Sequence, residues 1–366
     1  MNRVILIGNG FDLAHGMKTS YNDFIKYILE TEKDNVINEL RRTDINSQYY
    51  YADGFISVTS PRKLAEIRNI NYDKKGISFF DELNKLKFAE QIGSDNVTLK
   101  IQYTNIFFKE LIIKNDLNNW VDIEYEYYKA LMDCINGKRE YGINKLNSDF
   151  SHVTKALENY LSILMKNKIE LSDKILDKLT SIIKPIEVNN HYEINMDDNV
   201  LMVIFNYTNL IEKYLDAHFP FCKDKIKCIY IHGQLGNNEN KIIFGYGDEL
   251  DDNYKFIENI NDNKYLDNVK SIKYSETDNY NTLKSSIDAS NYEVYIMGHS
   301  CGISDKTLLN TIFEHKNCLF IKVFYHQIND ATDNYSDIYK NISRNFINKQ
   351  LMRSIVYNKT KCEPLI

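Results

Sequence analysis

The chain has 366 residues, of which 43% are hydrophobic and 26% charged, with only 4 prolines, so its composition indicates a folded protein rather than a disordered one. The formal net charge of −6 argues against broad nucleic-acid binding. We find no signal peptide and no apolar run long enough to span a bilayer, and the 6 cysteines form no Cys-x-x-Cys pair. We therefore expect a cytoplasmic protein with free thiols, no zinc site and no membrane partner.

The first predicted element is a buried strand over residues 4–7, which stops at Gly8-Asn9-Gly10. A strand that breaks into a glycine turn is how α/β proteins bring backbone N–H groups up to a phosphate. Ser20 and Asp23 then form an S-x-x-D capping pattern, and apolar residues follow at helical spacing. The chain therefore opens as strand, glycine loop and helix.

Residues 35–194 contain few glycines and many charges, and we interpret them as a largely helical insertion. Residues 49–75 give no clear signal and are interpreted as a loop or lid. Amphipathic spacing predicts helices over residues 107–113, 123–135, 153–165 and 171–183.

Strand signals return late in the chain, and each predicted strand ends in polar or glycine residues. These strands cover residues 201–205, 228–231, 242–244, 294–297 and 319–324, with helices over 210–218 and 306–315. Open parallel sheets bind ligands outside the carboxyl ends of their strands, so we expect one composite site there. The sequence predicts a single α/β domain over residues 1–366, with a core of 1–34 and 195–330, the insertion and a C-terminal extension of 331–366.

The glycine loop with Asp12 has two interpretations. It is either a phosphate or ribose loop in which Asp12 binds a sugar or amide, or a tight turn with Asp12 as a helix cap. The full G-x-G-x-x-G spacing is absent, so the motif alone does not decide between them.

Two later strand ends carry further candidates. Asn206 offers a donor and an acceptor that suit a water or a carboxamide, whereas Thr208 and Asn209 are also good caps for the next helix. His232, followed by Gly233, is a candidate general base because its pKa lies near neutrality, although a lone histidine is more often structural.

Residues 298–302 read Gly-His-Ser-Cys-Gly and match the G-x-S-x-G elbow of serine hydrolases. The helix that should follow is delayed by Gly302 and by a Ser304 or Asp305 cap, which weighs against Ser300 as a nucleophile. We favour a cluster of backbone N–H groups and a hydroxyl that touches a dinucleotide.

The only tryptophan precedes two acids, Asp122 and Glu124. On a strand these carboxylates would share a face, and on a helix they would not. They are interpreted either as carboxylates that the insertion brings to the site or as part of an exposed helix start.

Taken together, these motifs resemble the bacteriophage abortive-infection AbiH family. The stretch from Ile7 to Gly16, with Thr19-Ser20-Tyr21, carries the resemblance most specifically. Residues 120–124, 205–208, 231–233 and 298–300 followed by Asp305 are shorter matches in the same order.

AbiH proteins are in turn similar to sirtuin-like domains, which implies a Rossmann-type parallel sheet that binds NAD. On this resemblance Gly8 and Gly10 cradle the pyrophosphate, and Gly298 and Ser300 contact the adenosine side. Asn206 positions the ribose or the attacking water, His232 is the base, and Asp12 has suitable catalytic chemistry. The remaining residues that we expect to contact the nucleotide are Asn9, Phe11, Thr208, His299, Asp122 and Glu124.

The chain lacks the zinc-binding cysteine pairs of sirtuins and has Thr208 where an acid is usual, which argues against protein deacylation. The resemblance implies an antiphage effector that hydrolyses NAD at the nicotinamide–ribose bond, with NAD as substrate rather than cofactor. We expect control by a phage-derived trigger or by homo-oligomerisation. The alternatives are a non-catalytic nucleotide sensor and a serine hydrolase that uses Ser300.

Overall fold

A computed structural model of the chain describes residues 2–42, 49–60, 100–113, 120–184, 186–188, 191–194, 198–222, 224–246 and 252–366. The chain divides into two compact units. The sheet unit comprises residues 1–19 and 161–366, and the helical unit comprises residues 20–160.

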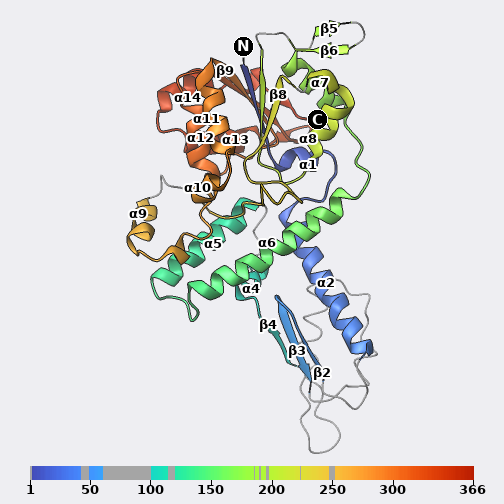
Figure 1. The fold of residues 1–366 in the computed structure, drawn as a ribbon, viewed down its shortest axis with the longest axis vertical. Coiled ribbons are helices and arrows are strands. Elements are labelled where there is room, and N and C mark those ends of the chain that lie inside the picture. The colour runs from blue at the N-terminus through green and yellow to red at the C-terminus, as the bar shows by residue number, and fades with distance from the viewer. Residues whose placement is uncertain are drawn as a thin grey trace, which may run out of the picture. The chain divides into compact units, whose positions relative to one another are not determined.

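A six-stranded parallel sheet forms the centre of the sheet unit, in the order β13-β10-β9-β1-β7-β8 (Figure 1). Its strands are β1 (Asn2–Ile7), β7 (Val200–Ile204), β8 (Ile226–Tyr230), β9 (Tyr292–Met297), β10 (Cys318–Tyr325) and β13 (Glu363–Pro364). Counted in chain order, the sheet reads 6-5-4-1-2-3. Doubly wound sheets that bind dinucleotides share this order, and they bind where it reverses, which here lies between β1 and β9.

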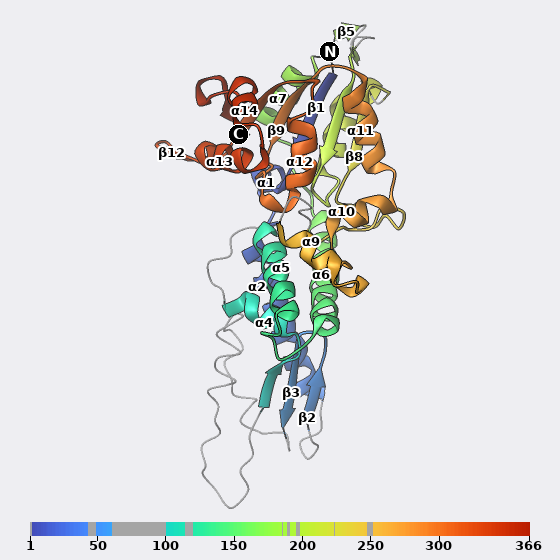
Figure 2. The same cartoon turned by 90° about the vertical axis from the view of Figure 1, so that its left-hand side faces the viewer.

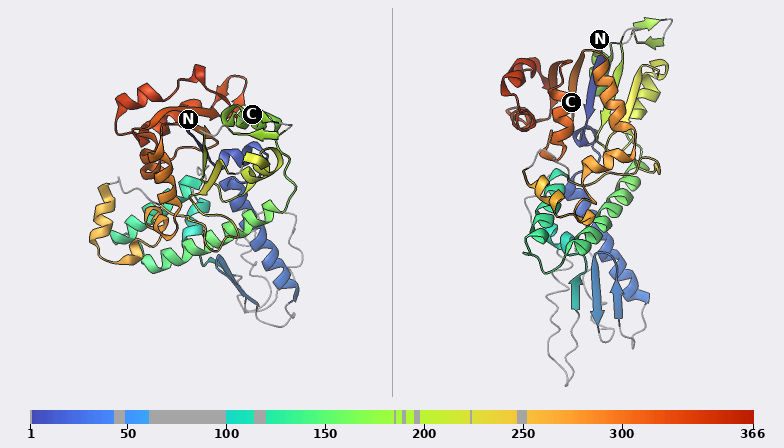
Figure 3. Two further views of the ribbon diagram at one scale, coloured as in Figure 1. Left: turned by 45° about the horizontal axis from the view of Figure 1, so that its top comes forward. Right: turned by 60° about the vertical axis from the view of Figure 1, so that its left-hand side comes forward.

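Both faces of the sheet are apolar because alternate strand residues point to opposite sides. In β1, Val4 and Leu6 join one core, and Ile5 and Ile7 join the other. The helices that supply the first core are α11 (Asn279–Ala289), α12 (Lys306–Phe313), α13 (Tyr335–Asn345) and α14 (Lys349–Ile355). Those that supply the second are α1 (Asn9–Ala14), α7 (Asp173–Ile183) and α8 (Leu210–His218). The sheet therefore lies between two helical layers (Figures 2 and 3).

Shorter elements complete the sheet unit. They are the hairpins β5–β6 (Ile186–Val188, His191–Glu193) and β11–β12 (Gln327–Asn329, Thr332–Asp333), the helices α9 (Asp252–Asn259) and α10 (Lys270–Lys273), and the 3₁₀ turns η2 (Pro220–Cys222), η3 (Asn263–Tyr265), η4 (Tyr274–Glu276), η5 (Ile303–Asp305) and η6 (Lys359–Lys361). The connection between β8 and β9 carries α10 and η4, and both contribute polar side chains to the site described below.

The helical unit contains α2 (Tyr21–Arg42), α4 (Ile106–Ile113), α5 (Trp120–Ile135) and α6 (Ile143–Met165), of which α6 runs past the boundary at residue 160. It also contains an antiparallel sheet of β2 (Tyr49–Ala52), β3 (Ile56–Ser60) and β4 (Lys100–Tyr103). The predicted cap of α2 is confirmed, because the Asp23 N–H donates to Ser20 Oγ over 3.2 Å.

Most elements predicted from the sequence are confirmed: β1, β7, β8, β9, β10 and the helices α2, α4, α5, α7, α8 and α12 all lie within a few residues of their expected bounds. α6 begins ten residues earlier than expected. The predicted strand over residues 242–244 is wrong. Ile243 and Phe244 are buried in an irregular segment, where a short apolar run has the same appearance as a strand.

The predicted domain bounds also differ from the two units. Residues 49–60 form strands β2 and β3 rather than a loop or lid, and residues 61–75 of that prediction lie outside the described residues. α7 lies within the predicted insertion, yet it packs on the sheet through Ile175, Leu179 and Ile182. Residues 331–366 supply α13, α14 and the edge strand β13, so they belong to the sheet unit.

Candidate functional site at the carboxyl edge of the sheet

Two glycine turns meet at the switch point between β1 and β9. The Gly10 N–H donates to the Gly298 carbonyl over 2.8 Å, and the Gly8 N–H donates to the carbonyl that ends β9 over 3.1 Å. A Cβ on Gly8 would lie 2.4 Å from the Cα of His299, and one on Gly298 would lie 2.1 Å from the backbone nitrogen of Phe11. Gly298 also has a φ of +75°. Close backbone packing therefore requires glycine at both turns.

The same packing occupies the donors that a phosphate would need. The N–H groups of Gly8, Gly10 and Phe11 all donate to protein carbonyls, and the Asn9 amide donates to the Thr19 carbonyl over 2.9 Å. The Phe11 ring is fully buried in the core. The pyrophosphate cradle stays a prediction, and these amide groups are already engaged within the protein.

Asp12 is buried on α1, one turn beyond the glycine loop. The Thr208 hydroxyl donates to its Oδ2 over 2.8 Å, whereas Oδ1 has no hydrogen-bond partner among the described residues. Burial raises the pKa of Asp12 from 3.8 to about 7, against the opposing effect of hydrogen bonding from Thr208 and Asn206. Asp12 does not cap α1, because Gly8 is the N-cap of that helix. Asn209 occupies the N-cap position of α8, as the capping alternative predicts, but makes no side-chain cap hydrogen bond.

Asn206 follows β7 and is 6% exposed. Neither its Oδ1 nor its Nδ2 makes a hydrogen bond of regular geometry to any described residue, although the amide lies close enough to affect the pKa of Asp12. A buried amide that lacks both partners is costly, and it is complementary to a ligand that offers a donor and an acceptor. Asn206, which follows β7, and Asp12, on the helix that follows β1, therefore form a buried polar pair in which the amide and Asp12 Oδ1 lack hydrogen bonds of regular geometry.

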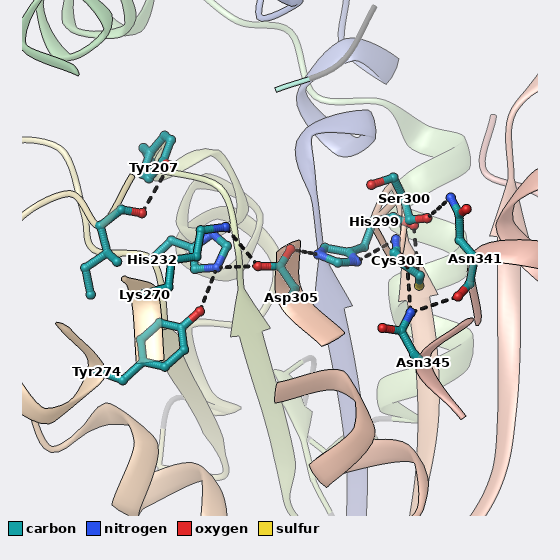
Figure 4. A network of polar contacts seen from close by, with 11 residues as sticks. Tyr207, His232, Lys270, Tyr274, His299, Ser300, Cys301, Asp305, Asn341 and Asn345 are labelled. Atoms are coloured by element: carbon teal, nitrogen blue, oxygen red, sulfur yellow. Dashed lines mark hydrogen bonds and ion pairs between the residues drawn. The ribbon is translucent and has the colours of Figure 1, made fainter. Parts of the chain in front are cut away.

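His232 lies just beyond β8 and contacts a buried carboxylate, Asp305 (Figure 4). Its Nε2 lies 3.0 Å from Asp305 Oδ1 and 3.2 Å from the Tyr274 hydroxyl. The same Asp305 oxygen accepts a hydrogen bond from Lys270 Nζ over 3.0 Å. Lys270 is 1% exposed, so this ion pair is almost fully removed from solvent.

The charges of this cluster set the protonation of His232. Burial and the Lys270 charge lower the pKa of His232 from 6.5 to about 4, and they outweigh the opposing effect of Asp305. Burial alone would raise the pKa of Asp305, but Lys270 and then His232 hold it well below its usual range. At neutral pH the imidazole is therefore neutral and Asp305 is ionised.

The hydrogen-bond network also assigns the tautomer of His232. An ionised Asp305 only accepts hydrogen bonds, so Nε2 carries the proton and Nδ1 carries the lone pair. No hydrogen bond from the described part of the chain reaches Nδ1. A carboxylate that orients an imidazole and leaves the other ring nitrogen as a lone pair is the arrangement of a general base.

His299 approaches Asp305 from the opposite side (Figure 4). The Cys301 N–H donates to His299 Nδ1 over 3.0 Å, which leaves the proton on Nε2, 3.5 Å from Asp305 Oδ2. The ring of Phe205 packs against both imidazoles, with centroids 4.0 Å from His299 and 5.1 Å from His232. The ends of β7, β8 and β9 thus contribute to one cluster.

Ser300 is exposed, and its carbonyl accepts a hydrogen bond from the Asn341 amide over 2.8 Å. Within the described residues its hydroxyl has no histidine partner, because the ring of His299 is already bound to Asp305 and to the Cys301 N–H. The strained residue of the turn is Cys301, with a φ of 55°, rather than the serine. This geometry supplies no base for a serine nucleophile.

Asp122 and Glu124 lie on α5, so the two acids do not share a strand face. α5 begins at Trp120, as the helix-start interpretation predicts, but Glu124 is 4% exposed and therefore not on an exposed face. Both belong to the helical unit, and the side chain of Asp122 lies outside the described part of the structure. Their contact with a nucleotide stays a prediction.

The sequence reasoning missed three members of the cluster. The sequence predicts Asp305 as a helix cap, and Asp305 does occupy the N-cap position of α12. Its carboxylate, however, makes no cap hydrogen bond and points to the histidines. The sequence signal that could have placed Asp305 in the site is its position shortly after the Gly-His-Ser motif. Lys270 and Tyr274 come from a connection with no recognisable motif, so nothing in the sequence marked them.

Three findings concern the described residues as a whole. In the part of the chain that the structure describes, no group of three histidine, cysteine or acidic residues is arranged to hold a metal ion. None of the helices described there has both the length and the apolar character that a bilayer crossing needs. The six cysteines are free thiols.

The fold and site define an α/β protein with a doubly wound order of parallel strands and a buried acid–amide–histidine cluster at their carboxyl ends. A family model described as "Bacteriophage abortive infection AbiH" matches residues 4–326. The chain therefore belongs to the AbiH family and is an abortive-infection antiphage protein. No match was found among the curated proteins or the solved structures.

Proposed function

We propose that this AbiH protein binds NAD at the carboxyl edge of its sheet and hydrolyses the bond between nicotinamide and ribose. The strand order supports this proposal, because doubly wound sheets of this order bind dinucleotides at the switch point, here between β1 and β9. The Rossmann-type and sirtuin-like relation is part of the proposal. It agrees with the positions of the two glycine turns on either side of that point.

The observation that carries the proposal is the unsatisfied pair of Asn206 and Asp12. A structural cluster gains nothing from a buried amide without partners, whereas a ligand site requires unmet hydrogen bonds before the ligand arrives. The hydroxyls of a ribose, a carboxamide and an ordered water all offer both donors and acceptors. We assign Asn206 to hold the ribose or the attacking water.

The reaction requires little covalent help from the protein. The oxygen of water forms a bond to the anomeric carbon of the ribose, and the bond from that carbon to the nicotinamide nitrogen breaks. The bonding electron pair neutralises the pyridinium nitrogen, and one proton of the water passes to a base. The products are nicotinamide, ADP-ribose and a proton.

Each step has a residue of suitable chemistry. His232 Nδ1 carries the lone pair that receives the proton, and Asp305 holds the ring in that tautomer. The transition state bears positive charge on the sugar, and ionised Asp12 stabilises it electrostatically. Since the pKa of Asp12 is about 7, a substantial fraction of this carboxyl is ionised at neutral pH.

Loss of NAD would halt an infected cell and so limit phage growth. Such an activity must be silent before infection, so we propose that a phage-derived trigger or association with further copies of the chain switches it on.

The test measures nicotinamide release from NAD by the purified full chain, with and without lysate from phage-infected cells. Asn206→Ala and His232→Ala are compared with His315→Ala. His315 precedes β10 and pairs with the half-exposed Asp288, at the opposite edge of the sheet, so it is a matched histidine control. We expect release by the wild-type protein and by His315→Ala, and none by the other two variants.

Other outcomes would replace the proposal. Binding of NAD without turnover under either condition would identify a nucleotide sensor. Labelling of Ser300 by a fluorophosphonate, lost in Ser300→Ala, would identify a serine hydrolase. If the protein neither binds NAD nor hydrolyses it, the doubly wound sheet does not carry this chemistry.

A further inference from the structure

Asn345, at the end of α13, is a polar side chain in an apolar environment. It is 0% exposed, and its neighbours on the helix, Ile342 and Phe346, belong to the core. Its Nδ2 donates to the Cys301 carbonyl over 2.8 Å and to the Asn341 carbonyl over 2.9 Å. Both partners are acceptors, so the orientation of the amide is fixed.

Asn341, one helical turn earlier, makes the matching contact. Its Nδ2 donates to the Ser300 carbonyl over 2.8 Å. Residues four apart lie on the same face of a helix, so α13 presents two amides to two consecutive carbonyls (Figure 4). We call this pair, Asn341 and Asn345, the α13 clamp.

The clamped carbonyls flank an unusual backbone conformation. Cys301 has a φ of 55°, in the left-handed region that residues other than glycine rarely adopt. In this conformation the Cys301 N–H turns back to the ring of His299 and donates to Nδ1 over 3.0 Å. The strained residue therefore fixes the ring that faces Asp305.

We propose that Asn345 and Asn341 are positioning residues that set the tautomer of His299 by holding Cys301 in its left-handed conformation. A backbone N–H only donates, so His299 Nδ1 must carry the lone pair and Nε2 must carry the proton that faces Asp305. Without the clamp, Cys301 relaxes to an ordinary conformation, its N–H leaves Nδ1, and the other tautomer becomes accessible.

The clamp lies beyond residues 4–326, the segment that matches the family model. The C-terminal segment 331–366 thus supports the site through α13, in addition to its strand in the sheet. The predicted contact of His299 with the nucleotide rests on the proposed function, whereas the control of its tautomer does not.

The experiment records the ¹⁵N side-chain spectrum of the histidines in the full chain, with the His299 signals assigned by their loss in His299→Gln. We expect one neutral tautomer with the proton on Nε2 in the wild-type protein. Asn345→Asp keeps the size of the side chain but removes the donor, and Asn341→Ala removes the more accessible half of the clamp. Both variants should give a mixture of tautomers.

A rescue variant separates positioning from simple stability. Glycine adopts positive φ without the steric cost, so Asn345→Asp/Cys301→Gly should restore the single tautomer. If Asn345→Asp does not fold, Asn341→Ala and Asn341→Ala/Cys301→Gly decide the question. A lower melting temperature with an unchanged single tautomer in the clamp variants would overturn the proposal. If the tautomer of His299 depends on the clamp but the wild-type protein releases no nicotinamide, only the proposed function is overturned.

Discussion

Because Asp12 is buried, the free energy of unfolding of the wild-type protein should fall as pH rises. The variant Asp12→Asn, which carries an amide at this position, should lack this contribution. The folded-state pKa of about 7 exceeds the usual 3.8 because burial disfavours the carboxylate. Between these values the folded protein holds a proton that the unfolded chain has released, so the free energy of unfolding decreases with rising pH. The decrease is complete above pH about 7.

The magnitude follows from the size of the pKa shift. Each unit corresponds to about 1.4 kcal/mol, so a shift of about three units makes ionisation of Asp12 cost about 4 kcal/mol in total. Between pH of about 5 and about 8.5, roughly 3 kcal/mol of this cost appears. Asp12→Asn does not ionise, so its stability relative to wild type should improve by that amount over the same interval.

The assay is urea unfolding of both proteins at the two pH values, with Asp330→Asn as control because Asp330 lies at an exposed turn. The infrared difference spectrum between wild type and Asp12→Asn should also contain the carbonyl stretch of a protonated carboxyl at the lower pH only. Parallel stability curves for wild type and Asp12→Asn, with no such band, would refute the reasoning that burial holds Asp12 partly protonated.

Three further predictions concern the same edge of the sheet. Asp305→Ala removes one carboxylate from the Lys270 ammonium, which is 1% exposed, so calorimetry should show a loss of about 3–5 kcal/mol that Asp305→Ala/Lys270→Met largely recovers. Equal stability of the two variants would contradict this. Gly298→Ala places a Cβ 2.1 Å from a backbone nitrogen and should abolish folding of the sheet unit, whereas Gly16→Ala, at a φ of +70° in open space, should lower the free energy of unfolding by only about 1–2 kcal/mol. Similar melting temperatures of the two variants would show that the turns do not pack as described. The rate of nicotinamide release should increase with pH through about 7, because Asp12 ionises there while His232 is already neutral, and Asp12→Asn should lack this increase. A pH profile that Asp12→Asn leaves unchanged would show that Asp12 takes no part in the reaction.

Much of the fold could be predicted because its strands are buried on both faces and appear as unbroken apolar runs. Residues 200–204 are all buried, and their run ends at the polar Asn206. The same signal failed at residues 242–244, where a short apolar run fills an irregular connection. The strand at Glu363–Pro364 was missed because two residues give no periodicity and it is a strand only through its pairing with β10.

The site was predictable where a residue follows a strand, and not where the tertiary structure supplies it. Asn206, His232 and His299 follow β7, β8 and β9, which are parallel strands of one sheet, so their side chains gather at the same edge. Asp305 has the sequence features of a helix cap, and its carboxylate meets His232, His299 and Lys270 only in the tertiary structure. The glycines were predicted for phosphate contact, yet their immediate physical reason is that two backbone turns touch.

The most direct test of a nucleotide site at this edge is a titration of the protein with ADP-ribose, followed through the ring signals of its 8 histidines. We predict that the signals of His232 and His299 shift together and saturate, while that of His315, at the opposite edge, stays unchanged. Unchanged signals of His232 and His299, or a shift confined to His315, would contradict a nucleotide site at the carboxyl ends of these strands.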